Sequence, residues 1–267
     1  MICWGQIDEH LKAALVQAGL DSVNGAFAFG QGKDLVKSGL GTRRRTRLSL
    51  TDAVGRSHEL YLKRYGPLPW PRRLGKFTSP AAVEFRAIEF VRQAQVPAPR
   101  ALLYGQECPL CDGRSFLVLT AVAGEAIERG GARYFEQSGP VQERATDRLA
   151  ELVRALHGAG LVHRDLYASH VFAHEAQGKR VELNLIDLAR VFRPRWRQFR
   201  WRVKDLAALH FSMPPAWTLA QWSRFLRQYL GPVDPRQQSR WERAILNKSA
   251  AMRHRHQRHQ AAAGGER

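Results

Sequence analysis

Four groups of residues with reactive side chains follow one another along the chain. Lys63 lies in a segment whose alternation is typical of a strand, and Glu84 lies on the apolar face of an expected helix. His163-Arg164-Asp165 follows a short apolar pair, and Asp187 ends an apolar run. A lysine, a carboxylate that orients it and two further carboxylates are the parts needed to transfer a phosphoryl group from ATP to a hydroxyl.

Each group also has a simpler explanation when it is taken alone. A strand lysine usually extends its ammonium group to solvent, an aspartate after a strand is often a turn residue, and the three letters HRD occur by chance. The order of the groups favours the chemical interpretation. The 22 residues from Asp165 to Asp187 leave room for a catalytic loop, a hairpin and a metal-binding turn.

The elements that must position these residues divide the chain into two parts. Strands are expected at about 46–50, 60–65, 100–105 and 115–120. Helices are expected over about 80–95 and 141–157 and again from about 203. The change near residue 122 predicts an α+β fold of two lobes. A small β-rich lobe would cover 1–122 and a larger helical lobe 123–250, with 251–267 as an irregular basic tail.

The position of Glu84 makes a specific demand on the fold. Glu84, Ala87, Ile88 and Val91 fall on one helical face, because they are spaced i, i+3, i+4 and i+7. A carboxylate at the head of an apolar face points inward, and a buried charge without a partner is costly. We therefore expect a partner for Glu84.

The composition indicates a globular, strongly basic protein. Hydrophobic residues make up 44% and charged residues 25%, and the net charge is +18. No apolar run approaches the ~20 residues of a membrane span, three cysteines cannot all pair within the chain, and the first residues lack a signal-peptide pattern. We expect a cytoplasmic protein with an anionic partner: nucleic acid, a membrane surface or a phosphorylated substrate.

A dense basic run follows Asp187, where an activation or substrate segment would lie. Its cations are Arg190, Arg193, Arg195, Arg197, Arg200, Arg202 and Lys204, with Trp196, Phe199 and Trp201 between them. Basic residues interleaved with aromatics are also typical of nucleic-acid binding. Beside the phosphoryl-transfer residues, an acceptor that is already anionic is the preferred interpretation, and a solvated basic loop is the simpler alternative.

Two further motifs are weak on their own. Gly39 and Gly41 form a G-x-G that would let backbone N–H groups approach phosphate, although a third glycine is missing at the usual spacing. Cys108 and Cys111 form a C-x-x-C without a second cysteine pair, so we expect free thiols rather than a zinc site.

The longer motifs resemble those of one known family, the heptose and Kdo kinases of the bacterial lipopolysaccharide core. The resemblance runs from about residue 34 to 230. It is carried by Glu84-Phe85-Arg86-Ala87-Ile88, Val96-Pro97-Ala98-Pro99, His163-Arg164-Asp165-Leu166-Tyr167-Ala168-Ser169-His170, Ile186-Asp187-Leu188-Ala189-Arg190 and Trp201-Arg202-Val203-Lys204-Asp205-Leu206. The form H-R-D-x-Y-x-x-H is the most specific, because protein kinases have Asn where His170 stands.

The resemblance implies a protein-kinase-like fold, ATP and Mg²⁺, and a role for each matched residue. Asp165, with His163 and Arg164, would form the catalytic loop, and Asp187 would bind Mg²⁺. His170 would be a second metal ligand or a hydrogen-bonding residue of the loop, and both alternatives remain open. Asp205 resembles a buried aspartate that braces the loop backbone, and the alternative is an aspartate at the start of a helix, where the helix dipole favours it. Phosphate binding would fall to Lys63 paired with Glu84, and to Gly39 and Gly41.

The implied function is phosphorylation of a heptose or Kdo hydroxyl of the lipopolysaccharide inner core at the cytoplasmic membrane face. The basic run, from Arg190 through Arg193 and Arg195 to Arg197, would contact this anionic glycolipid. Two alternatives are a kinase of the same fold with a protein or small-molecule acceptor, and a non-catalytic protein that binds nucleic acid or lipid. The complete set of Lys63, Glu84, Asp165 and Asp187 argues against the second, and the need for a partner protein stays open.

Overall fold

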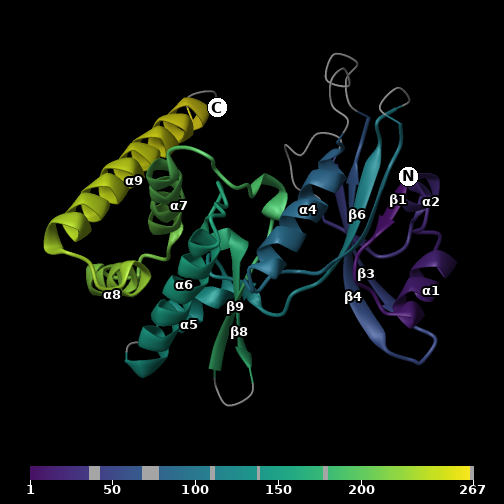
Figure 1. The fold of residues 1–267 in the computed structure, drawn as a ribbon, viewed down its shortest axis with the longest axis horizontal. Helices are drawn as coiled ribbons and strands as arrows, with labels where there is room; N and C mark the ends of the chain where they lie inside the picture. The colour runs from purple at the N-terminus through teal and green to yellow at the C-terminus, as the bar shows by residue number, and fades with distance from the viewer. Residues whose placement is uncertain (36–42, 68–77, 109–111, 137–138, 177–179, 265–267) are drawn as a thin grey trace. The chain divides into compact units, whose positions relative to one another are not determined.

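The computed structural model describes residues 1–35, 43–67, 78–108, 112–136, 139–176 and 180–264. Gly39, Gly41 and Cys111 lie outside the described residues. The chain divides into two compact units (Figure 1). The first contains residues 1–92 and 99–122, and the second contains residues 93–98 and 123–267.

The described part of the first unit is built on an antiparallel sheet with the strand order β1-β5-β6-β4-β3-β2. The strands are β1 (Ile2–Trp4), β2 (Lys33–Asp34), β3 (Arg43–Thr51), β4 (Ser57–Tyr65), β5 (Ala101–Gln106) and β6 (Ser115–Thr120). The four expected strands correspond to β3 to β6. β1 and β2 were not expected, because strands of two or three residues are too short to show alternation and depend on pairing with β5 and β3.

Helices cover both faces of this sheet. The short helices α1 (Glu9–Gln17) and α2 (Val23–Ala28) lie on one face, and α4 (Pro80–Gln93) lies on the other (Figure 1). Successive side chains of a strand point to opposite faces. Leu60 and Leu62 therefore pack into the apolar cluster beneath α1 and α2, whereas Lys63 and Tyr65 point toward α4.

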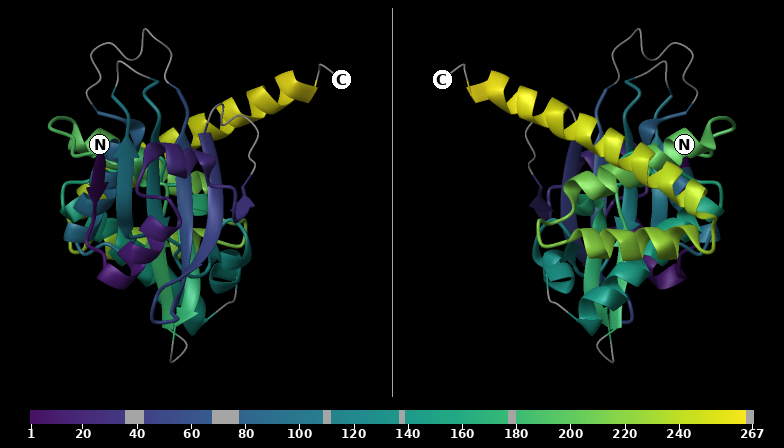
Figure 2. Two further views of the ribbon diagram at one scale, coloured as in Figure 1. Left: turned by 90° about the vertical axis from the view of Figure 1, so that its right-hand side faces the viewer. Right: turned by 90° about the vertical axis from the view of Figure 1, so that its left-hand side faces the viewer.

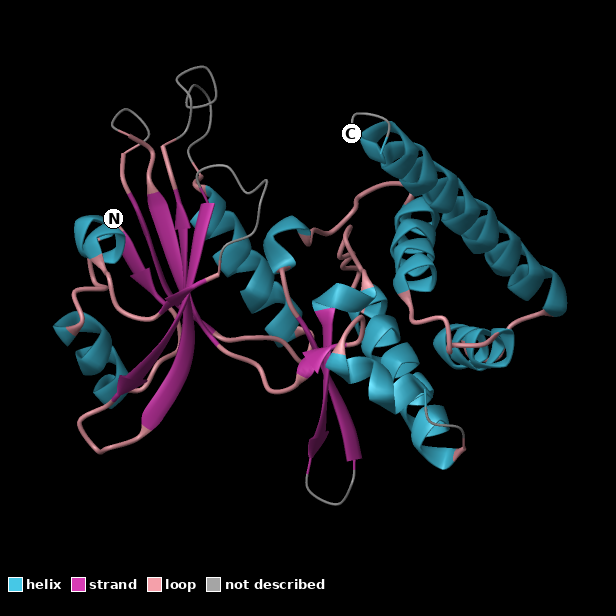
Figure 3. Ribbon diagram, turned by 180° about the vertical axis from the view of Figure 1, so that it is seen from behind, coloured by secondary structure: helices cyan, strands magenta, loops and turns pink. Residues whose placement is uncertain are grey.

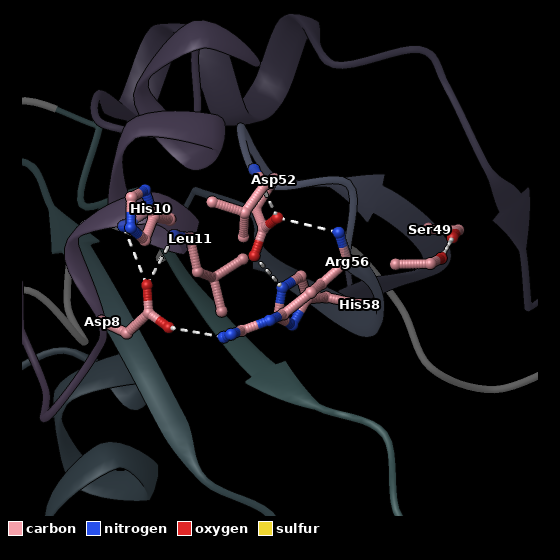
Figure 4. Close-up of polar contacts among 9 residues, drawn as sticks. Asp8, His10, Leu11, Ser49, Asp52, Arg56 and His58 are labelled. Atoms are coloured by element: carbon pink, nitrogen blue, oxygen red, sulfur yellow. Dashed lines mark hydrogen bonds and ion pairs between the residues drawn. The ribbon is translucent and has the colours of Figure 1, made fainter.

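The turn between β3 and β4 is organised by a buried carboxylate (Figure 4). Oδ1 of Asp52 accepts hydrogen bonds from the backbone N–H groups of Val54 at 3.0 Å and Arg56 at 2.9 Å. Oδ2 lies 2.9 Å from Nε2 of His58. The His58 hydrogen bond, followed by those from the two amides, holds the pKa of Asp52 below its usual value of 3.8. The ionised carboxylate therefore stabilises the hairpin.

The second unit combines helices with a small sheet of the order β7-β8-β9 among its described residues (Figure 3). Its strands are β7 (Glu125–Ala126), β8 (Val171–Ala176) and β9 (Arg180–Leu185). Its α-helices are α5 (Arg133–Glu136), α6 (Pro140–Gly158), α7 (Gln198–Ser212), α8 (Leu219–Leu230) and α9 (Pro235–Gly264). Short 3₁₀ turns cover Gly130–Ala132, Ala168–His170 and Leu188–Arg190. None of the described helices is long and apolar enough to cross a membrane.

The C-terminal segment corrects the expectation of an irregular tail over 251–267. Residues up to Gly264 continue α9 without a break (Figure 2). Trp241 packs on Phe199 of α7 and Tyr229 of α8, and His256 contacts Phe211 of α7. The charge of the segment suggested a solvated tail, but its arginine, alanine and glutamine residues are also good helix formers.

Replacing Asp52 by Asn should lower the thermal unfolding midpoint in a pH-dependent way. A carboxyl group whose pKa is lowered on folding stabilises the protein above its unfolded pKa and loses that contribution as the pH falls through the folded pKa. The midpoint difference between wild type and Asp52→Asn should therefore be fully present above pH 3.8 and shrink below it. Calorimetry from pH 7 to 2 measures this difference, with the exposed Asp21→Asn as control. A pH-independent difference would contradict the assignment.

Candidate active site

In the first unit, Lys63 and Glu84 form the expected ion pair. Lys63 and Tyr65 are two residues apart on β4, so both side chains reach the face covered by α4. The Lys63 ammonium donates to Oε1 of Glu84, and the Tyr65 hydroxyl donates to Oε2. The Glu84 side chain is 2% exposed and that of Lys63 is 11% exposed. Because both carboxylate oxygens have donors, the buried charge is compensated and the lysine is held in one orientation.

In the second unit, the loop that carries His163-Arg164-Asp165 is held by a buried carboxylate of α7. Asp205 is fully buried, and its two oxygens accept from the backbone N–H groups of His163 at 2.6 Å and Arg164 at 2.7 Å. Arg164 has a φ of +72°, a left-handed conformation that side chains other than glycine rarely adopt. The expected bracing role of Asp205 is confirmed, and its hydrogen bonds offset the strain at Arg164.

A histidine and a tyrosine extend this brace, and neither was identified from the sequence. Nε2 of His157 on α6 donates to Oδ2 of Asp205 at 3.3 Å, and Nδ1 lies 2.8 Å from the hydroxyl of Tyr229 on α8. Burial raises the pKa of Tyr229, so the hydroxyl keeps its proton and can donate it to His157. The available signal was a histidine on the apolar stripe of α6, four residues after Val153.

The first two residues of the His163-Arg164-Asp165 motif do not present a free side chain to solvent. His163 is buried, and Arg164 packs on aromatic rings. His163 is fully buried, and its Nε2 donates to the carbonyl oxygen of Ile186 at 3.0 Å. Burial lowers the pKa of His163, which favours the neutral imidazole. The Arg164 guanidinium lies over the rings of Phe192 and Trp201 at 5.5 and 5.6 Å.

Asp165, the third residue of the motif, is partly accessible to solvent. The Asp165 side chain is 22% exposed, so its carboxylate can meet a ligand. The hydrogen bond from His163 to Ile186 also ties the Asp165 loop to the residue before Asp187.

Asp187 and His170 lie side by side in the second unit. Asp187 has a φ of +57°, and its Oδ2 is 3.8 Å from Nε2 of His170. Nδ1 of His170 donates to the carbonyl oxygen of Asp165 at 2.8 Å. His170 therefore makes the loop hydrogen bond that was one of its two expected roles, and its Nε2 still faces Asp187.

Asp187 and His170 are the candidate metal ligands that were expected from the sequence. The described residues contain no group of three or more His, Cys, Asp or Glu side chains placed to hold a metal. Mg²⁺ is commonly bound by one or two carboxylates plus the phosphates of a nucleotide, and it prefers oxygen to imidazole. The Asp187 carboxylate fits Mg²⁺ of this kind, and His170 fits it less well.

The expected substrate arginines are all exposed, but one of them already has an acidic partner. Nη1 of Arg190 contacts Oδ1 and Oδ2 of Asp165 at 2.7 and 2.8 Å. Arg193, Arg195 and Arg197 are exposed to solvent. The contact between Arg190 and Asp165 was not anticipated from the sequence, where the two residues are 25 positions apart.

The chain is similar in sequence to known lipopolysaccharide kinases. The family model described as "Lipopolysaccharide kinase (Kdo/WaaP) family" matches residues 42–229. The lipopolysaccharide core heptose(I) kinase WaaP of Pseudomonas aeruginosa is 31% identical over 157 residues, which cover 56% of this chain and 59% of that protein. The WaaP protein of Escherichia coli K12 is 36% identical over 88 residues, 32% of this chain and 33% of the relative. Each match thus spans less than two thirds of the relative.

A solved structure supports the same relationship. The structure described as WaaP in complex with acyl carrier protein has a TM-score of 0.69 and 27% identity to this chain, and covers 94% of this chain and 97% of its own. The sheet unit and the helical unit, together with the likeness to this solved structure, define a protein-kinase-like α+β fold, as expected from the sequence. The family match places the chain more narrowly. It belongs to the lipopolysaccharide kinase (Kdo/WaaP) family.

Replacing Asp205 by Asn should destabilise the second unit strongly. The amide puts a donor where the carboxylate accepts from backbone N–H groups, so we expect a loss of about 2–4 kcal/mol in the free energy of unfolding. Asp147→Asn is the matched control, because Asp147 pairs with Arg224 on a partly exposed surface. It should cost about 1 kcal/mol or less. Urea unfolding followed by circular dichroism measures both, and equal losses would contradict the brace.

Proposed function

We propose that the chain is an ATP-dependent sugar kinase that phosphorylates a heptose or Kdo hydroxyl of the lipopolysaccharide inner core. The observation that carries this proposal is the Asp205-braced loop, which presents one accessible carboxylate, Asp165, in a member of the lipopolysaccharide kinase family. The Lys63–Glu84 pair adds a cation suited to nucleotide phosphates. In this reaction, positioning and electrostatic stabilisation account for most of the acceleration.

Each residue of the proposed active site has a separate role in the reaction. Asp165 orients the acceptor hydroxyl and receives its proton as the oxygen attacks the γ-phosphoryl group. Lys63, held by Glu84, contacts the α- and β-phosphates. His163 and Arg164 are positioning residues, because the first is buried and the second is packed on aromatic rings.

Asp187 is the proposed ligand of Mg²⁺, which would supply charge neutralisation at the nucleotide phosphates. The carboxylate is an oxygen donor of the kind that Mg²⁺ prefers. His170 orients the Asp165 loop through its hydrogen bond to the carbonyl oxygen, and this is the role we prefer for it over direct ligation.

The positive charge of the chain supports the proposed acceptor and a location at a membrane surface. Arg193, Arg195 and Arg197 are exposed and suit the carboxylates and phosphates of an inner-core acceptor. A net charge of +18 suits attachment to the anionic cytoplasmic face of a membrane. The acyl carrier protein in the related structure makes such a protein the first candidate for an auxiliary partner of this chain.

Replacing Asp165 or Asp187 by Asn should separate two steps of the reaction. Asp165→Asn removes the proton acceptor, so acceptor-dependent turnover should fall about 100-fold or more while Mg-ATP binding is retained. Asp187→Asn should instead weaken Mg-ATP binding. Turnover with dephosphorylated lipopolysaccharide core, together with calorimetric titration of Mg-ATP, measures both properties. Full activity in Asp165→Asn would contradict the assignment.

Replacing Lys63 by Met should weaken nucleotide binding without changing acceptor binding. The loss of one charge-assisted contact to phosphate predicts an ATP affinity about tenfold or more lower. Lys12→Met is the matched control, because Lys12 is a partly exposed lysine of α1 that pairs with Glu9. The control should bind ATP as the wild type does. A Lys63 variant with unchanged ATP affinity and an altered acceptor KM would exclude the proposed contact.

A further inference from the structure

Arg190 occupies the carboxylate to which we assign the proton of the acceptor hydroxyl. A single nitrogen, Nη1, lies between the two oxygens of Asp165, 2.7 and 2.8 Å from them. Both oxygens therefore accept from the guanidinium in this arrangement. A hydroxyl that approached Asp165 would have to compete with Arg190 for the same lone pairs.

The contact between Arg190 and Asp165 differs in geometry from the ion pair between Arg224 and Asp147 in the same unit. Arg224 grips Asp147 with two nitrogens, Nε and Nη2, each 2.8 Å from a separate oxygen. Arg190 uses one nitrogen and its side chain is 50% exposed. Its Nε and Nη2 groups have no hydrogen-bond partner among the described residues. An exposed ion pair of this kind contributes little to stability, so the guanidinium can be exchanged between partners at small cost.

The neighbourhood of the pair carries an excess of positive charge. Arg164 and Lys204 both lie by the ring of Trp201. Lys204 interacts electrostatically with Arg164, Arg190 and Asp165. Burial is the main cause that lowers the pKa of Lys204, and the charge of Arg190 adds to it. The three cations Arg164, Arg190 and Lys204 outnumber Asp165 and Asp205, the two carboxylates that interact with Lys204, so an additional anionic group would be attracted to the site.

We propose that Arg190 determines acceptor specificity by exchanging partners. Without an acceptor it holds Asp165, and with an anionic acceptor it moves to a carboxylate or phosphate group of that molecule. The exchange leaves the Asp165 carboxylate free to receive the acceptor hydroxyl. An acceptor that carries no anion cannot draw Arg190 away and is phosphorylated slowly. This inference rests on the proposed kinase function and gives Arg190 a role in selecting its substrate.

Three acceptors with increasing charge distinguish the sources of the anion. The first is a neutral methyl heptoside, the second a heptose–Kdo oligosaccharide with carboxylates only, and the third the same core joined to lipid A with its phosphates. Wild type should prefer the second over the first if a carboxylate displaces Arg190. A preference that begins only with the third acceptor would assign the displacement to phosphate.

Arg190→Ala should improve turnover of the neutral acceptor and impair the use of the anionic acceptors. For the neutral heptoside, kcat should rise about two- to fivefold, because Asp165 is released from an exposed ion pair. For the anionic acceptors, KM should rise about tenfold or more, because one charge-assisted contact is lost. Arg190→Lys should restore part of the anionic preference. Arg144→Ala, which removes an exposed arginine from α6, is the charge-matched control and should change neither value.

The outcomes separate failure of this inference from failure of the proposed function. Equal losses with neutral and anionic acceptors, or results that match Arg144→Ala, would overturn the role of Arg190 while leaving the kinase in place. A neutral-acceptor kcat that falls in Arg190→Ala would do the same. No acceptor-dependent turnover by the wild type with any of the three would overturn the proposed function, and this inference with it.

Discussion

The hydrogen bonds that the buried carboxylate of Asp205 accepts from the backbone hold the loop of His163, Arg164 and Asp165 in place in the second unit. They fix two consecutive amides, and the second belongs to Arg164, whose φ of +72° is unfavourable for a side chain with a Cβ. His157 adds a third donor to the same carboxylate. The left-handed conformation of Arg164 changes the direction of the chain between the buried His163 and the partly exposed Asp165.

The same principle organises the first unit, where a buried charge is retained although an apolar pair would serve stability at least as well. Glu84 accepts from Lys63 and from Tyr65, so neither oxygen lacks a partner. The pair fixes an ammonium group that would otherwise sample many rotamers. In each unit a buried carboxylate with hydrogen-bond donors on both oxygens orients a residue of the proposed site: Glu84 orients Lys63, and Asp205 orients the loop of Asp165.

Much of this arrangement could be predicted from the sequence, for physical reasons that can be named. Glu84 stood out because a carboxylate on an apolar helical face needs a partner, and the family resemblance assigned Lys63 to that role. His157 gave the same signal on α6 but no motif drew attention to it. The Arg190–Asp165 contact depends on how two loops meet in space, and nothing local encodes it. The continuation of α9 past residue 250 was missed because charge was weighed above helix propensity.

The most direct test of the account is the product of the reaction. The chain would be incubated with Mg-ATP and lipopolysaccharide inner core that lacks phosphate on its sugars, and the core oligosaccharide would then be examined by mass spectrometry with fragmentation. The account predicts one added phosphate group on a heptose or Kdo residue, absent when Asp165 is replaced by Asn. An unmodified core, with the γ-phosphoryl group recovered on a protein or in water, would contradict it.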